Sequence, residues 1–142
     1  MDVSRLPFNR LIGLELASPE SDFLVSLPDK PEYANHLGTV HGSALLAVAE
    51  AGSGEFLARQ FGDVKGFVPV VRKLEARFRK PASGRVSSRC LVTQDVIGSW
   101  SAELTSRGRL SASIPVEVVD ANGVVVMSAV FEWFISKGDI NA

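Results

Sequence analysis

The sequence predicts an α+β domain in which an antiparallel β-sheet wraps around one long central helix. Three observations support this prediction. The stretch from about residue 40 to residue 61 has helical spacing and is apolar on nearly all sides, which is typical of a helix buried at the centre of a domain. The segments that follow alternate apolar and polar residues, as half-buried strands do. A shorter strand or hairpin precedes the helix, and a sheet with one helix against one face is a stable layered arrangement.

The length and composition are those of a single globular domain over residues 1–142. Hydrophobic residues make up 46% of the chain and charged residues 22%, so a sizeable core can form. The formal net charge of -1 gives no basic surface of the kind that binds nucleic acid. No apolar run approaches the ~18 residues that span a bilayer, and the first residues lack the layout of a signal peptide. We therefore expect a cytoplasmic protein that binds neither nucleic acid nor a membrane.

The residues before the central helix predict a short helix, a strand and a loop. Residues 4–12 form a short helical segment that ends before Gly13. The stretch up to Leu27 contains alternating pieces, which favour a first strand or hairpin. Pro28 and Pro31 then break regular structure and begin a polar loop, from which the chain enters the central helix.

The central helix is predicted to begin within residues 40–43 and to end near Gly62. Its apolar positions follow the spacing of one helical face: Leu45, Val48, Ala49, Gly52 and Phe56. Glu50 is the single charge between His41 and Gly54. Because removing an unpaired carboxylate from water costs several kcal/mol, Glu50 is either paired structurally or kept for chemistry.

Two glycines follow Glu50 in this helix. Gly52 and Gly54 each cost a helix interior roughly 0.8–1 kcal/mol relative to alanine. They therefore favour a close approach by another backbone, a second subunit or a ligand. The alternative is a helix that ends near Gly52, with Glu50 exposed in its last turn.

Two strands are predicted directly after the central helix. Residues 66–78 alternate apolar and charged side chains, which predicts a half-buried strand. Its apolar residues are Leu74, Ala76 and Phe78. After a turn, residues 86–93 predict a second strand. It contains Cys90, the only cysteine, which we expect to be a small core residue without a metal or a thiolate role.

The last third of the chain predicts a short helix and a hairpin. Residues 95–108 depart from alternation and predict a helix capped by Ser99 and ended by Gly108. A strand over residues 110–118 and a turn at residues 120–123 lead into the last strand. One face of that strand is predicted to lie in the core: Val125, Met127, Ala129, Phe131, Trp133 and Ile135. Because a single sheet leaves an exposed edge that invites pairing, we expect a dimer.

One motif connects this layout to a known family. The residues Asn35-x-x-Gly38-x-x-His41-Gly42, with an acid nine residues after His41, resemble the signature of the hotdog-fold acyl-CoA thioesterases. The likeness is closest to the phenylacetate-pathway type and its relatives, and it covers about residues 30–136. It implies a hotdog fold and hydrolysis of an acyl-CoA or aryl-CoA thioester to the free acid and coenzyme A at a dimer interface. It also implies a homodimer or a homotetramer, no metal, and no cofactor besides the coenzyme A of the substrate.

The resemblance implies catalytic roles for four residues. The Gly42 backbone N–H would polarise the thioester carbonyl, because free N–H groups and the helix dipole favour negative charge at a helix N-terminus. Glu50 would be the general base or the nucleophile. Asn35 would orient the attacking water or the carbonyl, and His41 would hold the loop or polarise the same oxygen.

The chain departs from the family pattern in several places. Ser43 stands where a second glycine is usual, and the acid is Glu50 rather than the aspartate common in the phenylacetate-type branch. The Ser or Thr that often assists from the following strand has no clear equivalent, and Ser53, one helical turn from Glu50, is the substitute. The segment over residues 95–108 is atypical and resembles that of a poorly characterised hotdog branch.

Substrate binding is expected at two sets of residues. The phosphates of coenzyme A need cations, which flank the turn at residues 81–84, although a solvated strand face is the alternative. The cations are Arg77, Arg79 and Lys80, with Arg85 and Arg89. The expected substrate-binding set also contains Ser43, Ser53, Val68, Ser83 and Gly84. An apolar acyl or aryl pocket is expected from Leu46, Phe56, Phe67 and Val68.

Two other functions fit parts of the sequence. Hotdog 3-hydroxyacyl dehydratases and hydratases place a catalytic histidine fourteen residues before a helical Glu, which is the spacing of His36 and Glu50, but their proline-rich loop is missing here. A hotdog protein that binds acyl-CoA without turnover is the non-enzymatic alternative. A catalytic Glu50 should face a cavity with the Gly42 N–H within reach, whereas a structural one should pair with Arg or Lys. The sequence favours a thioester hydrolase.

Overall fold

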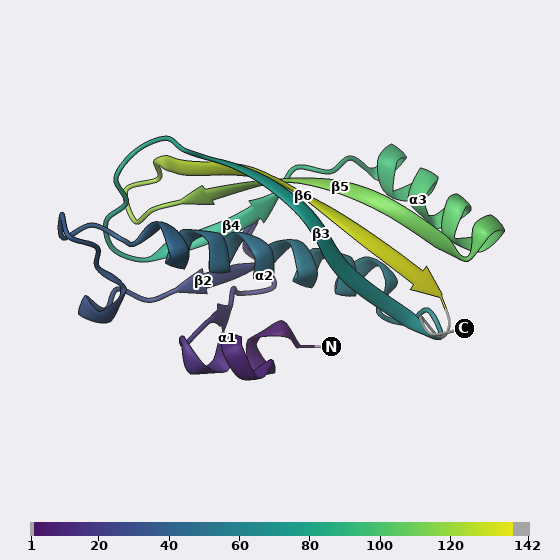
Figure 1. Cartoon of the computed structure of the whole chain (residues 1–142), viewed down its shortest axis with the longest axis horizontal. Helices are drawn as coiled ribbons and strands as arrows, with labels where there is room; N and C mark the ends of the chain where they lie inside the picture. The colour runs from purple at the N-terminus through teal and green to yellow at the C-terminus, as the bar shows by residue number, and fades with distance from the viewer. Residues whose placement is uncertain (1, 138–142) are drawn as a thin grey trace.

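The computed structural model describes residues 2–137, in which a sheet covers one long helix (Figure 1). The segments before the long helix are η1 (Val3–Arg5), α1 (Pro7–Leu11), β1 (Glu15–Leu16), β2 (Val25–Leu27) and η2 (Pro31–Tyr33). The long helix is α2 (Gly42–Phe61). It is followed by β3 (Phe67–Phe78), β4 (Val86–Cys90), α3 (Gln94–Arg107), β5 (Arg109–Val119) and β6 (Val125–Lys137). The predicted leading helix, first hairpin, central helix and later strands are all present.

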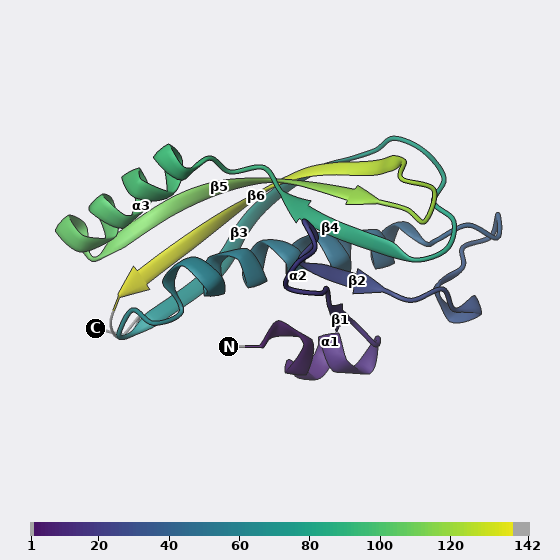
Figure 2. The same ribbon diagram turned by 180° about the vertical axis from the view of Figure 1, so that it is seen from behind.

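The strands form one six-stranded antiparallel sheet in the order β1-β2-β4-β5-β6-β3. Figures 1 and 2 show from opposite sides that this sheet curves over α2 and that α3 lies beside β5, past the end of β4. The predicted α+β architecture, an antiparallel sheet around a central helix, is confirmed. No helix within residues 2–137 combines the length and the apolar character needed to cross a lipid bilayer.

Helix α2 is packed against the inner face of the sheet. Its Val48 and Leu57 are fully buried, and they share one core with Phe131 of β6. The helix runs through Gly52 without a break, so the alternative of a helix end at that residue is wrong. A Cβ added to Gly52 would lie 2.2 Å from Ser88 Oγ on β4. The close approach expected at Gly52 is therefore made by this chain's own sheet.

The predicted core face of the last strand is confirmed. Five of its predicted residues are buried: Met127, Ala129, Phe131, Trp133 and Ile135. The turn that leads into this strand ends at Gly123, whose φ of 79° lies in the left-handed region that favours glycine. The glycine at the end of the turn and the alternation of apolar and polar residues along the strand therefore predicted this hairpin correctly.

Helix α3 begins earlier than predicted. Its N-cap is Thr93 rather than Ser99, and the Thr93 Oγ accepts a hydrogen bond from the Val96 backbone N–H at 3.4 Å. The reason is that β4 already ends at Cys90, and the earlier start lets Ile97 join the buried side of the helix. The buried residues of α3 are Ile97, Trp100 and Leu104. The predicted end at Gly108 is confirmed, with a φ of 73°.

The predicted half-burial of β3 is wrong over its second half. Leu74 and Phe78 are 42% and 54% exposed. They stand opposite Phe131 and Met127 in the β3–β6 register, so they lie on the same face of the sheet as those buried residues. Because β3 is an edge strand, no strand of the described residues 2–137 pairs with its outer side, and these apolar side chains stay partly uncovered.

Candidate active site

The N-terminus of α2 is fixed by His41. The His41 Nδ1 accepts a hydrogen bond from the Ser43 backbone N–H at 3.0 Å, so the imidazole caps the helix. The His41 backbone N–H donates to the Tyr33 carbonyl at 2.7 Å. The Gly42 N–H makes no hydrogen bond within residues 2–137. A free N–H at the positive end of the helix dipole is suited to polarising a carbonyl oxygen.

Asn35 organises the loop that leads to this helix. Its Oδ1 accepts hydrogen bonds from the Leu37 N–H at 2.9 Å and the Thr39 N–H at 3.1 Å. Its Nδ2 donates to Thr39 Oγ1 at 2.9 Å. Asn35 therefore holds the loop, and one N–H of its amide stays available for the water or carbonyl that it was predicted to orient.

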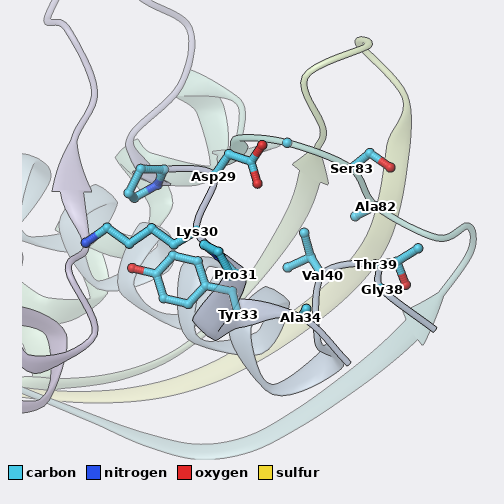
Figure 3. Close-up of a pocket in the computed structure, with 12 residues that line it drawn as sticks. Asp29, Lys30, Pro31, Tyr33, Ala34, Gly38, Thr39, Val40, Ala82 and Ser83 are labelled. Carbon is cyan, nitrogen blue, oxygen red and sulfur yellow. The ribbon is translucent and has the colours of Figure 1, made fainter. Parts of the chain in front are cut away.

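Two adjoining pockets surround this end of α2. The first, of about 350 Å³, is lined by Asn35, Gly42, Phe78, Arg79 and Lys80 among others. The second, of about 250 Å³, shares Thr39, Val40 and Ala82 with the first. Figure 3 shows it between Lys30 and Tyr33 on one side and Ala82 and Ser83 on the other. The structure thus brings the predicted Asn35, Gly42, Arg79, Lys80, Ser83 and Gly84 into one region.

Lys30 in this region was missed at the sequence level. It belongs to the lining of the second pocket, together with Ser83. The only local signal was a cation next to Pro31 in a loop, which does not distinguish a binding residue from a solvated one. The His41 and Ser43 side chains line a third pocket, of about 370 Å³, which shares no residue with the pocket at Gly42.

Glu50 lies on the open side of α2. It is exposed in the single chain, and it makes no ion pair within residues 2–137. It lines an apolar pocket of about 220 Å³ together with Gly54, Pro69 and Trp133. Eight residues separate it from Gly42, which is about 12 Å along the helix axis. Glu50 therefore faces a cavity, but the Gly42 N–H of the same chain is out of reach.

Ser53 is engaged inside the protein. It is fully buried, and its hydroxyl donates to the Glu50 carbonyl at 2.7 Å. The same Oγ accepts a hydrogen bond from the Trp133 Nε1 at 2.8 Å. Ser53 therefore lies behind the pocket lining, hydrogen-bonded to Glu50 and Trp133, and its expected direct contact with substrate finds no support in this geometry.

The predicted cluster of cations is divided by the sheet order. The strands β3 and β4 do not pair, because β5 and β6 lie between them. Arg85 pairs with Glu15 at 2.9 Å, and Arg89 pairs with Glu117 at 2.9 Å. Arg77 lines a separate groove across β3, β5 and β6, which it shares with Glu117. Arg79 and Lys80 are the predicted cations that remain at the pocket of Gly42.

The residues expected to form the acyl pocket do not lie beside Glu50 in this chain. Leu46, Phe56 and Phe67 are partly buried residues that pack against the core. None of them, nor Val68, lines the pocket beside Glu50. The residues that do line it come from η1, α1, β3 and β6 as well as α2, and sequence spacing alone gives no signal that these distant segments meet.

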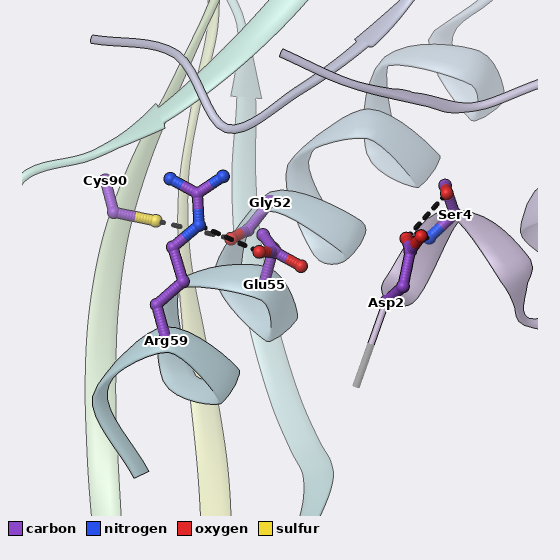
Figure 4. Close-up of polar contacts among 6 residues, drawn as sticks. All are labelled: Asp2, Ser4, Gly52, Glu55, Arg59 and Cys90. Carbon is purple, nitrogen blue, oxygen red and sulfur yellow. Dashed lines mark hydrogen bonds and ion pairs between the residues drawn. The ribbon is translucent and has the colours of Figure 1, made fainter. Parts of the chain in front are cut away.

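Two further groups lie on the inner side of α2. The Glu55 carboxylate is only 6% exposed, and its Oε2 accepts a hydrogen bond from the Arg59 Nε at 2.8 Å (Figure 4). This buried pair is not predictable from the sequence, because its only local signal is its i, i+4 spacing. The Cys90 thiol lies 3.8 Å from the Gly52 carbonyl, and burial raises the pKa of Cys90 to about 12. The core role expected for Cys90 is confirmed.

The fold defined by these elements is the hotdog fold, an antiparallel sheet around one central helix, which several solved structures share. A protein of unknown function from Pseudomonas aeruginosa, described as a probable thioesterase, superposes with a TM-score of 0.81 at 24% identity, over 94% of this chain and 90% of that one. A protein of unknown function from Chlorobaculum tepidum gives a TM-score of 0.80 at 18% identity, over 94% and 88%. A Bacillus halodurans protein solved with CoA gives 0.61 at 22% identity, over 78% and 65%.

The family itself carries no assigned activity. The chain belongs to the family described as Domain of unknown function (DUF4442), which it matches over residues 4–135. No curated protein matches the chain. The structural likenesses, all at low identity, establish the fold, and the chemistry must be argued from the site.

Proposed function

We propose that this protein hydrolyses an acyl-CoA or aryl-CoA thioester to the free acid and coenzyme A, and that it works in the cytoplasm as a homodimer. The observation that carries this proposal is a pair of groups on α2. Glu50 is a carboxylate without a cation partner in residues 2–137 beside an apolar pocket, and Gly42 presents a free N–H at the helix N-terminus. The Bacillus halodurans relative solved with CoA supports the choice of thioester.

The two groups act on one carbonyl only if two chains combine. Within one chain they are separated by about 12 Å along α2, which is too far for both to reach one reacting centre. Glu50 shares a pocket with Pro69 near the start of β3. A Cβ added to Gly42 would lie 3.2 Å from the ring of Phe78, at the end of β3. The two groups thus lie near opposite ends of the same edge strand.

Antiparallel pairing of two β3 edges would bring these ends together. About a two-fold axis, the Pro69 end of one β3 meets the Phe78 end of the partner's β3. Glu50 of one chain then approaches the partner's Gly42. The uncovered Leu74 and Phe78 support this pairing, because a second chain would bury them.

The chemistry needs few groups. The Gly42 N–H and the helix dipole polarise the thioester C=O and stabilise the negative charge on its oxygen. In the first route Glu50 acts as a general base and takes a proton from a water whose oxygen attacks the carbonyl carbon. In the second route the Glu50 carboxylate attacks the carbonyl carbon itself, and water then hydrolyses the acyl-enzyme. The C–S bond breaks, the thiolate of coenzyme A leaves and takes up a proton, and the acid is released. Both routes consume one water.

Coenzyme A is proposed to extend from this centre toward the pocket drawn in Figure 3. Arg79 and Lys80 stand at the pocket of Gly42, and their positive charges suit the phosphates of coenzyme A. Lys30 lines the adjoining pocket, where its ammonium group points away from Ala82 and Ser83 and would have to turn to reach a phosphate. Ser83 and Gly84 of the intervening turn complete this proposed binding surface.

The test is release of free thiol from short, medium, long and aryl acyl-CoA thioesters by the wild type and two variants. Glu50→Gln removes the base, and we expect turnover to fall by about a hundredfold or more. Gly42→Pro removes one N–H at a helix position that accepts proline, and a comparable fall is expected from the loss of the oxyanion donor.

Matched controls separate these effects from misfolding. Glu103→Gln changes an exposed acid on α3, and Gly42→Ala adds the same Cβ near Phe78 while keeping the N–H. Both should keep most of the activity.

Unchanged turnover in Glu50→Gln would contradict the proposal. Binding of acyl-CoA without release by the wild type would point instead to the non-catalytic binding protein. For the dehydratase alternative, His36 is exposed and does not line the pocket of Glu50 in the same chain, so that reaction would also need a histidine from a second chain.

A further inference from the structure

The pocket beside Glu50 is a built apolar site. Its walls come from η1, α1, α2, β3 and β6, and among residues 2–137 Glu50 is the only charged residue in its lining. The lining residues are Val3, Leu6, Asn9, Glu50, Ala51, Gly54, Pro69 and Trp133. Asn9 Nδ2 donates to the Val3 carbonyl at 2.9 Å, which holds η1 and α1 together over the pocket. The site is therefore formed by groups that other contacts already fix in place.

Trp133 is a fixed wall of this pocket. Its side chain is 9% exposed, and its Nε1 donates to the buried Ser53 Oγ at 2.8 Å. The Ser53 hydroxyl in turn donates to the Glu50 carbonyl at 2.7 Å. The indole ring is thus tied to the backbone of the helical turn that carries Glu50, so the wall and this turn keep a constant relative position.

Gly54 leaves space that the packing of this chain does not require. Glycine is less favourable than alanine inside a helix, so an internal glycine needs a reason. Gly52 has one, because an added Cβ would lie 2.2 Å from Ser88 Oγ. At Gly54 an added Cβ would be 3.5 Å from the Trp133 ring, an ordinary contact. The empty position beside the ring is therefore explained by a group from outside the chain.

We propose that this pocket receives the acyl group of the thioester and that Gly54 and Trp133 limit its size. The proposal rests on the proposed function, because it places the carbonyl beside Glu50 and the rest of the acyl group against the indole. A space of about 220 Å³ suits a compact acyl group, either one aromatic ring on a short link or a chain of medium length.

The first experiment measures kcat/KM for acetyl, hexanoyl, octanoyl, dodecanoyl and phenylacetyl thioesters of coenzyme A. Gly54→Ala and Gly54→Val fill the pocket stepwise. We expect kcat/KM for the hexanoyl, octanoyl and phenylacetyl substrates to fall by about tenfold or more, with acetyl within about twofold of the wild type. Gly98→Ala and Gly98→Val on α3, where an added Cβ meets nothing within 4 Å, are the matched controls. If the relative kcat/KM values for the five thioesters are the same in the Gly54 variants as in the wild type, the proposal is overturned.

The second experiment does not depend on turnover. In a Trp100→Phe background, the fluorescence of Trp133 reports on binding of the uncharged probes hexanamide and phenylacetamide. We expect a saturable change that Gly54→Val abolishes.

Binding with no hydrolysis of any thioester supports the pocket and refutes the proposed function. Hydrolysis with no probe binding refutes the pocket and leaves the proposed function standing. A Gly54→Val variant that dissociates into folded monomers shows that a partner chain fills the space, and this also overturns the proposal.

Discussion

Glu50 and Glu55 lie five residues apart on α2 in opposite environments. Glu55 is 6% exposed and is held by Arg59, whereas Glu50 is exposed and has no cation partner in residues 2–137. A carboxylate inside the protein needs a cation, because its desolvation is otherwise uncompensated. The structural acid and the proposed catalytic acid of this helix are thus distinguished by their partners, and sequence position alone does not separate them.

The Glu55–Arg59 pair should contribute to stability. We expect Arg59→Met to lower the free energy of unfolding by about 1.5–3 kcal/mol, because it leaves the buried carboxylate without its charged donor. Arg107→Met is the control, since Arg107 and Glu103 form an exposed pair with the same i, i+4 spacing at 3.6 Å. The control should cost less than about 1 kcal/mol. Urea unfolding measures both, and equal losses in the two variants would contradict the assignment.

Cys90 should make stability depend on alkaline pH. Burial raises its pKa from 9.0 to about 12, so between these values the unfolded thiol is ionised and the native thiol is not. The native state then binds more protons than the unfolded state, and stability falls as the pH rises through this window, by up to about 1.4 kcal/mol per pH unit. Urea unfolding of the wild type and Cys90→Ala at a series of pH values isolates this component. If the difference in free energy of unfolding between the wild type and Cys90→Ala stays constant above about pH 9, the Cys90 thiol is not the source of the pH dependence.

The element that most constrains the packing of α2 is β4. The two approach closely at Gly52, where an added Cβ would lie 2.2 Å from Ser88 Oγ and 2.9 Å from Ser88 Cβ. The three glycines in the interiors of helices α2 and α3 therefore differ in what surrounds them, although their intrinsic helix propensity is the same. Gly52 touches the sheet, Gly54 faces a pocket, and Gly98 faces open space.

Gly52→Ala should destabilise the fold. We expect a loss of about 1–3 kcal/mol, because the helix must shift away from β4. Gly98→Ala should instead leave stability unchanged or raise it by up to about 1 kcal/mol, from helix propensity alone. The double variant Gly52→Ala with Ser88→Gly removes the atoms that clash and should recover part of the loss. Absence of any recovery in urea unfolding would show that the close approach is not the cause.

At the scale of the whole molecule, the proposed site requires two chains. The edge strand β3 leaves Leu74 and Phe78 uncovered, and the distance between Gly42 and Glu50 along α2 prevents one chain from completing the site. Pairing of β3 with the β3 strand of a second chain would cover these apolar side chains, and it would bring Gly42 of one chain close to Glu50 of the other.

Mixing two inactive variants should restore activity. Gly42→Pro lacks the oxyanion donor and Glu50→Gln lacks the base, so each homodimer should be nearly inactive. A mixed dimer contains one complete site, and an equal mixture should recover about a quarter of wild-type turnover if subunits exchange at random. Free-thiol release after mixing measures this recovery, and sedimentation confirms that dimers are present. No recovery after demonstrated exchange would place both groups in sites formed within one chain.

Much of the architecture was predictable because its signals are local. The periodicity of residues 42–61, the alternation along β6 and the turn ending at Gly123 each depend on neighbouring residues, so helix, strand and hairpin were located correctly. The start of α3 was missed because its cap, Thr93, became available only when β4 ended early at Cys90.

The candidate site was predictable only in part. The motif from Asn35 to Gly42, the acid Glu50 and their helix could be predicted from the sequence, because these residues are close in the chain. The folded chain was needed to establish that β3 is an edge strand, that Arg85 and Arg89 are paired elsewhere, and that Trp133 lies near Gly54. These facts depend on segments far apart in the chain coming together, and no local pattern of residues encodes which distant surfaces will meet.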